Sequence, residues 1–108
     1  MSQRLSIDQQ RRSLQWWPFD GDKDGFDRVI EDRIVVGRRS ARRCHNCGEP
    51  TVSGDHVRIV SAMYGNCWHQ YRWCYECCEA ASRLDDGGFD ELVERCGRML
   101  ERLREPAP

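Results

Sequence analysis

Two cysteine pairs carry the strongest chemical signal in this chain of 108 residues. Cys44 pairs with Cys47 and Cys74 pairs with Cys77, each across two residues, and 26 residues separate the two pairs. A two-residue spacer lets both thiolates of a pair reach one ion, and four thiolates complete a tetrahedron around Zn²⁺. Gly48 follows the first pair and allows the backbone to fold back, as a zinc knuckle requires. The spacing therefore predicts a structural zinc site with no coordination position open for catalysis.

The setting expected for these cysteines is a reducing one. The N-terminal residues lack the apolar core of a secretory signal, no apolar run approaches the roughly 20 residues that cross a bilayer, and the cysteine count is an odd seven. We therefore expect a cytoplasmic protein (in the host cytoplasm if a phage encodes it) without a membrane partner. Cys67 is expected in a hairpin and Cys96 in the apolar core, while Cys78 is an alternative ligand.

Strand patterns lie on either side of the first cysteine pair. A β-branched run over residues 29–36 predicts one strand. Residues 57–63 and 68–73 predict two more, and a turn at 64–66 joins them into a hairpin.

Helical patterns follow the hairpin. A helix is expected from about residue 74 to residue 84, and the Asp-Asp-Gly-Gly run at 85–88 ends it. Residues 1–15 predict a short amphipathic helix. The last helix is the clearest element, because its apolar residues recur at helical spacing. These residues are Phe89, Leu92, Val93, Cys96, Met99, Leu100 and Leu103.

The order of knuckle, hairpin and helix resembles that of a treble-clef zinc finger over residues 44–84. The residues that carry the resemblance are Cys44-His45-Asn46-Cys47-Gly48, Gly54-Asp55-His56 and Tyr71-Arg72-Trp73-Cys74-Tyr75-Glu76-Cys77. With a strand ahead of the knuckle, the pattern is similar to that of small zinc-binding proteins of phages and prophages. The resemblance implies an α+β fold, a small treble-clef zinc finger with an N-terminal arm and a C-terminal amphipathic helix.

Three segments are expected on this basis. An N-terminal arm with an aromatic cluster and an acidic loop spans 1–28, the zinc domain spans 29–84, and a C-terminal helix packed on it spans 85–108. The apolar stripe of that helix is expected to close the core, with a dimer seam as the alternative, so the chain is a monomer or a homodimer. The phage-type resemblance implies a non-enzymatic binding module. It would be an inhibitor or adaptor, the anti-CRISPR type included, that binds a host protein or a nucleic-acid-processing complex.

A basic run directly before the first cysteine pair supports an alternative function, DNA or RNA binding. It consists of Arg38, Arg39, Arg42 and Arg43, and the guanidinium group suits forked hydrogen bonds to phosphate. The formal net charge of −1 does not fit a broad nucleic-acid-binding surface, so such a patch would be local. Aromatic residues are further binding candidates, although Tyr71 and Trp73 are expected to pack on the C-terminal helix. The aromatic candidates are Trp16, Trp17, Tyr71 and Trp73.

An HNH-like endonuclease is the second alternative, because such enzymes also use a treble clef and some carry a four-cysteine zinc. Asp55-His56 matches the first element of their pattern, and His69 lies near the middle position. The last position is Cys78, and a thiolate is a poor ligand for Mg²⁺. The resemblance therefore favours a degenerate relative. If the site is active, it implies His56 as the general base and His69 near the middle position of the pattern.

Residues 20–31 match the D-x-D-x-D-G-x₅-E pattern of a calcium-binding loop. Asp27 replaces the usual apolar residue, Pro18 interrupts the incoming helix, and no second loop exists for pairing. An acidic turn that leads into a strand is therefore the favoured interpretation, with Ca²⁺ as the alternative. The ligands would then be Asp20, Asp22, Asp24, the Phe26 carbonyl and Glu31.

Overall fold

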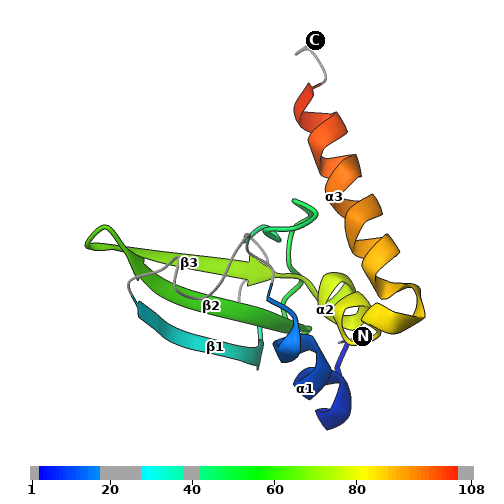
Figure 1. The fold of residues 1–108 in the computed structure, drawn as a ribbon, viewed down its shortest axis with the longest axis horizontal. Helices are drawn as coiled ribbons and strands as arrows, with labels where there is room; N and C mark the ends of the chain where they lie inside the picture. Colours follow the sequence, from blue (N-terminus) through cyan, green and yellow to red (C-terminus); the bar gives the residue numbers. More distant parts are fainter. Residues whose placement is uncertain (1–2, 18–27, 38–41, 105–108) are drawn as a thin grey trace.

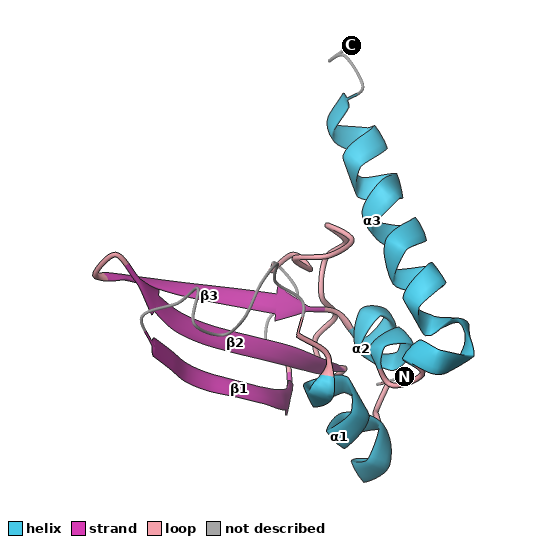
Figure 2. Ribbon diagram, viewed as in Figure 1, coloured by secondary structure: helices cyan, strands magenta, loops and turns pink. Residues whose placement is uncertain are grey.

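The computed structural model describes residues 3–17, 28–37 and 42–104. In chain order its elements are α1 (Ile7–Gln15), β1 (Arg28–Val36), β2 (His56–Tyr64), β3 (Cys67–Trp73), α2 (Tyr75–Ala81), the wide turn η2 (Leu84–Gly88) and α3 (Phe89–Arg104) (Figure 1). The predicted α+β class is confirmed: one antiparallel sheet lies beside α1 and α2, and α3 extends away from them (Figure 2). None of the described helices is long and apolar enough to cross a membrane.

The sheet has the order β1-β2-β3, so β2 is the central strand. All three predicted strands are confirmed, with ends that differ from the predicted ones by no more than one residue. The turn between β2 and β3 contains Gly65 and Asn66, whose φ angles are 58° and 62°. Two consecutive residues in the left-handed region are typical of a tight hairpin, and glycine and asparagine adopt that conformation most readily.

Helix α1 is part of the same core as the sheet. It begins at a capping box, in which the Ser6 hydroxyl accepts from the Gln9 amide at 3.1 Å and the Gln9 side chain accepts from the Ser6 amide at 2.9 Å. The fully buried Ser13 donates from its hydroxyl to the Cys78 carbonyl of α2 at 2.5 Å. The N-terminal residues are thus fastened to the segment that carries the second cysteine pair.

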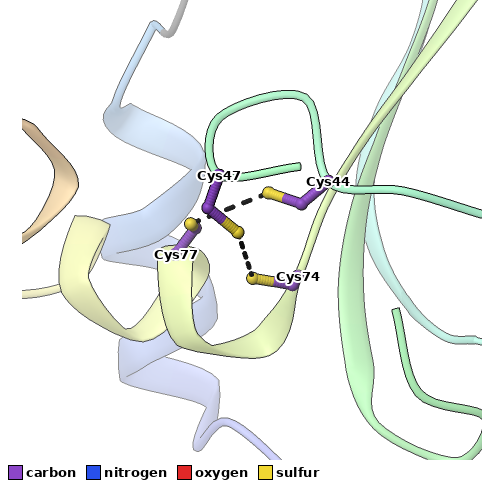
Figure 3. A group of neighbouring side chains, drawn as sticks. All are labelled: Cys44, Cys47, Cys74 and Cys77. Atoms are coloured by element: carbon purple, nitrogen blue, oxygen red, sulfur yellow. Dashed lines mark hydrogen bonds between the residues drawn. The ribbon is translucent and has the colours of Figure 1, made fainter. Parts of the chain in front are cut away.

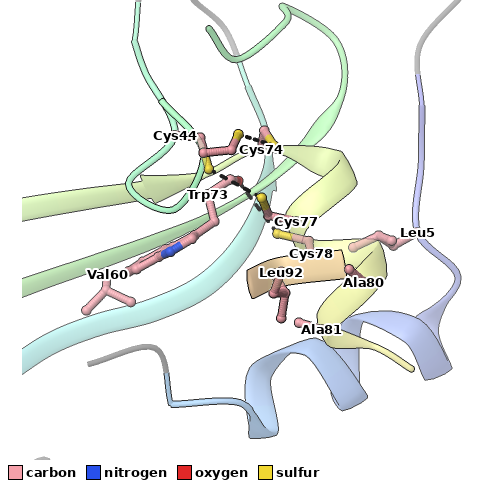
Figure 4. Close-up of a cluster of buried hydrophobic side chains, with 11 residues drawn as sticks. Leu5, Cys44, Val60, Trp73, Cys74, Cys77, Cys78, Ala80, Ala81 and Leu92 are labelled. Carbon is pink, nitrogen blue, oxygen red and sulfur yellow. Dashed lines mark hydrogen bonds between the residues drawn. The ribbon is translucent and has the colours of Figure 1, made fainter. Parts of the chain in front are cut away.

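The core lies between β2, β3, α1 and α2, and cysteines form a large part of it. Trp73 is its largest side chain and is 1% exposed. The centroid of its ring lies 6.4 Å from that of Trp16 and 5.5 Å from that of His45. The sequence predicts that this aromatic face packs on the C-terminal helix, whereas in the structure it packs on the knuckle and on Trp16. The cluster in Figure 4 comprises Leu5, Cys44, Cys47, Val60, Trp73, Cys74, Cys77, Cys78, Ala80, Ala81 and Leu92.

The turn η2, which contains the predicted helix-ending run at 85–88, separates α2 from α3, although α2 already ends at Ala81. Gly87 has a φ of 83°. A Cβ on Gly88 would lie 1.9 Å from the Ala80 carbonyl oxygen, so only glycine fits there. The close approach turns the chain sharply and sends α3 away from the sheet (Figure 1).

Helix α3 contains all the residues of the predicted apolar stripe, but their environment differs from the predicted one. Of its apolar stripe, Leu92 is buried, whereas Phe89, Val93, Leu100 and Leu103 are 59%, 55%, 45% and 74% exposed. The expectation that the stripe closes the core is therefore wrong for these four residues. The reason is that α3 contacts the domain through one edge of the stripe, along which Leu92 and Met99 lie, and not through its centre.

Candidate metal centre

The structure brings the four predicted cysteines together in one buried group. Their sulfur atoms all lie within 4.8 Å of one another, and each of the four residues is at most 3% exposed. The Sγ atoms of Cys44 and Cys77 are 3.7 Å apart, and so are those of Cys47 and Cys74 (Figure 3). A tetrahedron with Zn–S distances of about 2.3 Å has edges of about 3.8 Å. Two of the six sulfur–sulfur distances thus match the edge of such a tetrahedron, and none of the others exceeds 4.8 Å, so the group is compatible with a four-thiolate zinc site.

Two local structures place these sulfurs. In the knuckle, the Gly48 amide donates to the Cys44 carbonyl at 2.9 Å and the Cys44 amide donates to the Glu49 carbonyl at 2.8 Å. Gly48 has a φ of 72°, which a side chain would strain. The second pair lies at the start of α2, where Cys74 is the N-cap and Cys77 is in the first turn. Both pairs are thus positioned by their own short segments, which is why their spacing alone predicts the site.

Protonation also favours a cation among the sulfurs. Hydrogen bonding with Cys44 lowers the pKa of Cys47, whereas hydrogen bonding with the same residue raises the pKa of Cys74. Four sulfurs this close cannot all be thiolates unless a cation lies between them, because their charges repel one another. A divalent, thiophilic ion such as Zn²⁺ provides that charge.

Polar groups from the knuckle and from α3 surround the cysteines. The Asn46 side chain donates to the Cys77 sulfur at 3.5 Å and to the Leu92 carbonyl at 3.1 Å. Burial lowers the pKa of Arg95, but the charges of Cys77 and Cys74 outweigh this and raise it. Arg95 thus supplies positive charge beside a net negative cluster, and such surrounding groups tune a metal site.

Arg102 ties α3 to the knuckle. Its Nη2 donates to the Cys47 carbonyl at 2.8 Å, and its Nη1 contacts the Glu49 carboxylate at 2.5 Å. Sequence reasoning missed the roles of Asn46, Arg95 and Arg102. Asn46 lies inside the first C-x₂-C pair, which is a signal for an N–H···S contact, but the two arginines are distant in sequence and carry no such signal.

The other three cysteines lie outside the metal group. Cys78 is 1% exposed, its thiol donates to the Trp73 carbonyl at 3.6 Å, and burial raises its pKa to about 12. It is therefore a neutral core residue and not the alternative ligand. Cys67 is exposed in the hairpin, and Cys96 is half-buried on α3 rather than in the core.

The two histidines of the endonuclease alternative do not meet. His56 begins β2, whereas His69 pairs with Ala62, six residues further along that strand. At about 3.3 Å per residue, the two side chains are about 20 Å apart, too far to share a metal ion. The His56 Nδ1 accepts from the Leu5 amide at 2.8 Å, and the buried Asp55 accepts from the Gln3 amide at 2.7 Å.

The calcium candidates fall largely outside the described residues, because Asp20, Asp22, Asp24 and Phe26 are among those that the structure does not describe. Glu31 is described, and both of its carboxylate oxygens have partners. One accepts from the Ser61 hydroxyl at 2.9 Å and the other lies 3.0 Å from Arg33 Nε. This geometry gives no support to a bidentate calcium ligand at Glu31.

A cluster of arginines lies across the sheet and the knuckle. Arg33, Ile59 and Arg72 are direct neighbours in one row across the three strands, and they line a hollow together with Arg42. Arg42 and Arg72 also line a second hollow, with Arg43, His45 and Tyr71. We call Arg33, Arg42, Arg43 and Arg72 the arginine surface; Arg38 and Arg39 lie outside the described residues.

Positive charge on the arginine surface is poorly neutralised. In the described part of the chain, Arg33 is its only member with an ion-pair partner, Glu31. Burial lowers the pKa of Arg72, the nearby charge of Arg42 lowers it further, and the charge of Glu31 opposes this only in part. Such a cluster favours an anion as ligand. The sequence predicts Arg42 and Arg43 as binding residues, whereas Arg33 and Arg72 join them only through the strand register.

The aromatic candidates divide between core and surface. Trp73 is 1% exposed, so the prediction that it is a binding residue is wrong, because it fills the centre of the core. Trp16 and Trp17 are half-buried, and Trp16 packs edge-on against Trp73. Tyr71 is half-buried and faces the ring of His45 at a centroid distance of 5.0 Å, next to the arginine surface.

Comparison with models of known protein families, with curated proteins and with solved structures finds no match to this chain. Its function is therefore argued from the metal centre and the arginine surface.

Proposed function

We propose that the chain is a non-catalytic binding module of treble-clef type, held in shape by Zn²⁺ on Cys44, Cys47, Cys74 and Cys77. The tetrahedral spacing of the sulfurs supports the metal. The order of knuckle, β2-β3 hairpin and α2, with one cysteine pair on the knuckle and one on the helix, supports the treble-clef type. A zinc held by four protein ligands keeps no open position for substrate, which supports a structural role.

The ligand that fits the arginine surface best is the phosphate backbone of a nucleic acid. The observation that carries this proposal is the convergence of Arg33, Arg42, Arg43 and Arg72 with little neutralising charge. Guanidinium groups bind phosphate oxygens in a forked geometry. Tyr71 and His45 line a hollow together with Arg42, Arg43 and Arg72, so a base next to a bound phosphate would lie near aromatic side chains. We therefore favour a single-stranded or locally opened nucleic acid.

Fluorescence anisotropy with a labelled single-stranded oligonucleotide tests this proposal. Replacing Arg42 and Arg72 together by glutamine is expected to weaken binding at least tenfold, because two phosphate contacts are lost. The wild-type affinity should also fall steeply with salt, and the slope should be shallower in the variant. Arg98→Gln is the matched control, since Arg98 is exposed on α3 away from the arginine surface. Binding that ignores salt, or that is equal in the double variant, would contradict the proposal.

An inhibitor or adaptor of phage type, which the sequence resemblance implies, is a second candidate. The overall net charge of −1 favours it, because a local positive patch on a near-neutral chain suits a partner that combines protein and nucleic acid. Affinity capture from a lysate, with and without nuclease digestion, separates the two roles. A protein that stays bound after digestion supports the adaptor, whereas loss of all bound material supports direct nucleic-acid binding.

The non-catalytic part of the proposal has its own test. Supercoiled DNA incubated with the zinc-loaded protein and Mg²⁺, Mn²⁺ or Ni²⁺ is expected to stay intact, because His56 and His69 are too far apart to hold one catalytic ion. Agarose gels over several hours measure the outcome. Cleavage that His56→Ala abolishes would restore the endonuclease alternative.

A further inference from the structure

The exposed centre of the α3 stripe forms a seam with the spacing of a helix–helix interface. It consists of Phe89, Val93, Cys96, Leu100 and Leu103, which follow one another at intervals of four, three, four and three residues. That spacing is the heptad pattern by which one helix packs along another. The other edge of the stripe is already used within the chain, since Leu92 is buried and Met99 lies against Gly48.

The seam is continuous with an apolar hollow of about 360 Å³ beside it. Trp16 lines one wall of the hollow, and Phe89, Val93 and Leu100 line the helical wall. Because α3 extends away from the sheet, a second helix can approach this face along much of its length (Figure 1). An exposed apolar strip of this kind marks an interaction surface.

The seam can pack against an identical seam, and this indicates what covers it. In an antiparallel pair related by a two-fold axis, Val93 of one copy lies opposite Leu103 of the other, and Cys96 lies opposite Leu100, each pair occurring twice. Two copies of α3 therefore bring apolar residues of the seam opposite one another without using Leu92 or Met99, which pack within the chain.

Charge distribution selects the antiparallel orientation. Asp90, Gly97 and Arg104 occupy one row of α3 at intervals of seven residues, next to the seam. Within the described part of the chain, neither Asp90 nor Arg104 has an ion-pair partner. Antiparallel helices place Asp90 of one copy opposite Arg104 of the other, twice in the dimer. Parallel helices place like charges side by side.

Gly97 suits the point where the two helices would cross. Glycine in the middle of an exposed helix lowers helix propensity. A Cβ on Gly97 would meet nothing within 4 Å, so the packing of the described chain does not require glycine there. A neighbouring helix that approaches closely at this row would explain why position 97 is a glycine, since small residues allow two helix backbones to come near one another.

We propose that α3 binds α3 of a second copy of this chain, antiparallel, across a two-fold axis beside Cys96 and Gly97, with an Asp90–Arg104 pair at each end of the contact. The interface is isologous, so it closes as a dimer and does not extend into a fibre. Arg33, Arg42 and Arg72 of the arginine surface lie on the sheet side of the molecule, whereas Arg43 lines a hollow that it shares with Leu103 at the end of the seam.

Charge reversal at the two ends of the contact tests the proposal in the zinc-loaded full chain. Sedimentation equilibrium should give a concentration-dependent mass that approaches twice that of one chain. Asp90→Arg or Arg104→Asp alone should weaken self-association about tenfold, because each variant faces two like-charge pairs. An equimolar mixture of the two variants should recover the wild-type association, since every pair across the axis is again of opposite charge.

Controls separate interface effects from folding effects. Arg98→Asp makes the same change in charge as Arg104→Asp, but Arg98 is exposed about 200° around the helix from Cys96 and should not alter the association. Zinc content and circular dichroism confirm that each variant is folded. A chain that stays monomeric at millimolar concentration overturns the proposal. So does an assembly larger than a dimer, or a mixture that fails to recover association.

Discussion

Cys77→Ser is expected to abolish stoichiometric zinc binding and, with it, the cooperative thermal unfolding of the chain. The sulfur of Cys77 is one corner of the four-cysteine group, and the four cysteines are also members of the buried core. In zinc-finger peptides a structural zinc contributes about 10–16 kcal/mol of apparent binding free energy near neutral pH. Whole domains are stable by only about 5–15 kcal/mol. A chain of this size therefore has no reserve that replaces the metal.

Cys78→Ser is the matched control for that variant. Cys78 is the next residue of α2, is equally buried and lies outside the metal group. A serine hydroxyl can keep the hydrogen bond to the Trp73 carbonyl, so this variant should retain one zinc per chain and lose only a modest part of the stability. Elemental analysis and differential scanning calorimetry measure both effects. Normal zinc content and an unchanged melting curve for Cys77→Ser would remove the basis of the proposed fold and function.

The parts of the molecule that sequence reasoning predicts are those set by local chemistry. A C-x₂-C pair places its two sulfurs through a single turn, so Cys44 with Cys47 and Cys74 with Cys77 can be identified without any tertiary structure. The hairpin follows from a β-branched run, an aromatic run and the glycine-asparagine turn between them, again within a few residues. The α+β class then follows from the order of these elements.

The parts that sequence reasoning misses depend on contacts between distant segments. Periodicity shows which residues of α3 share a face, but not which edge of that face meets the domain, so the exposure of Val93 and Leu100 could not be predicted. The arginine surface depends on the strand register that places Arg33 and Arg72 in one row. A buried arginine, Arg58, is the largest such omission, because nothing in the alternation of β2 distinguishes it from a solvent-facing residue.

Asp32→Asn is expected to destabilise the chain by about 3–5 kcal/mol, because it removes the counter-charge of the buried Arg58. Arg58 is 1% exposed, and its Nε and Nη2 donate to the two oxygens of Asp32, each at 2.8 Å. Its Nη1 donates to the carbonyls of Ser13 at 3.1 Å and Trp16 at 2.5 Å. One guanidinium group thus joins β2, β1 and the end of α1, and with an amide at position 32 its charge would stay buried and uncompensated.

The ring of Trp73 adds a further contact to this arginine, since Arg58 Cζ lies 5.6 Å from the ring centroid. Arg58→Lys should therefore be nearly as harmful as Asp32→Asn, because an ammonium group cannot make the forked contact and reach both carbonyls. Urea unfolding at saturating zinc measures these changes.

Arg12→Met is the control for both variants, because it removes an exposed pair with Asp8 and should cost less than about 1 kcal/mol. The double variant Asp32→Leu with Arg58→Met should lose less free energy of unfolding than the single variants Asp32→Leu and Arg58→Met lose in sum, because it leaves no unpaired charge in the core. A free energy of unfolding for Asp32→Asn that lies within about 1 kcal/mol of the wild-type value would show that Arg58 reaches solvent. The packing of α1 on the sheet, which Arg58 holds together, would then need another cause.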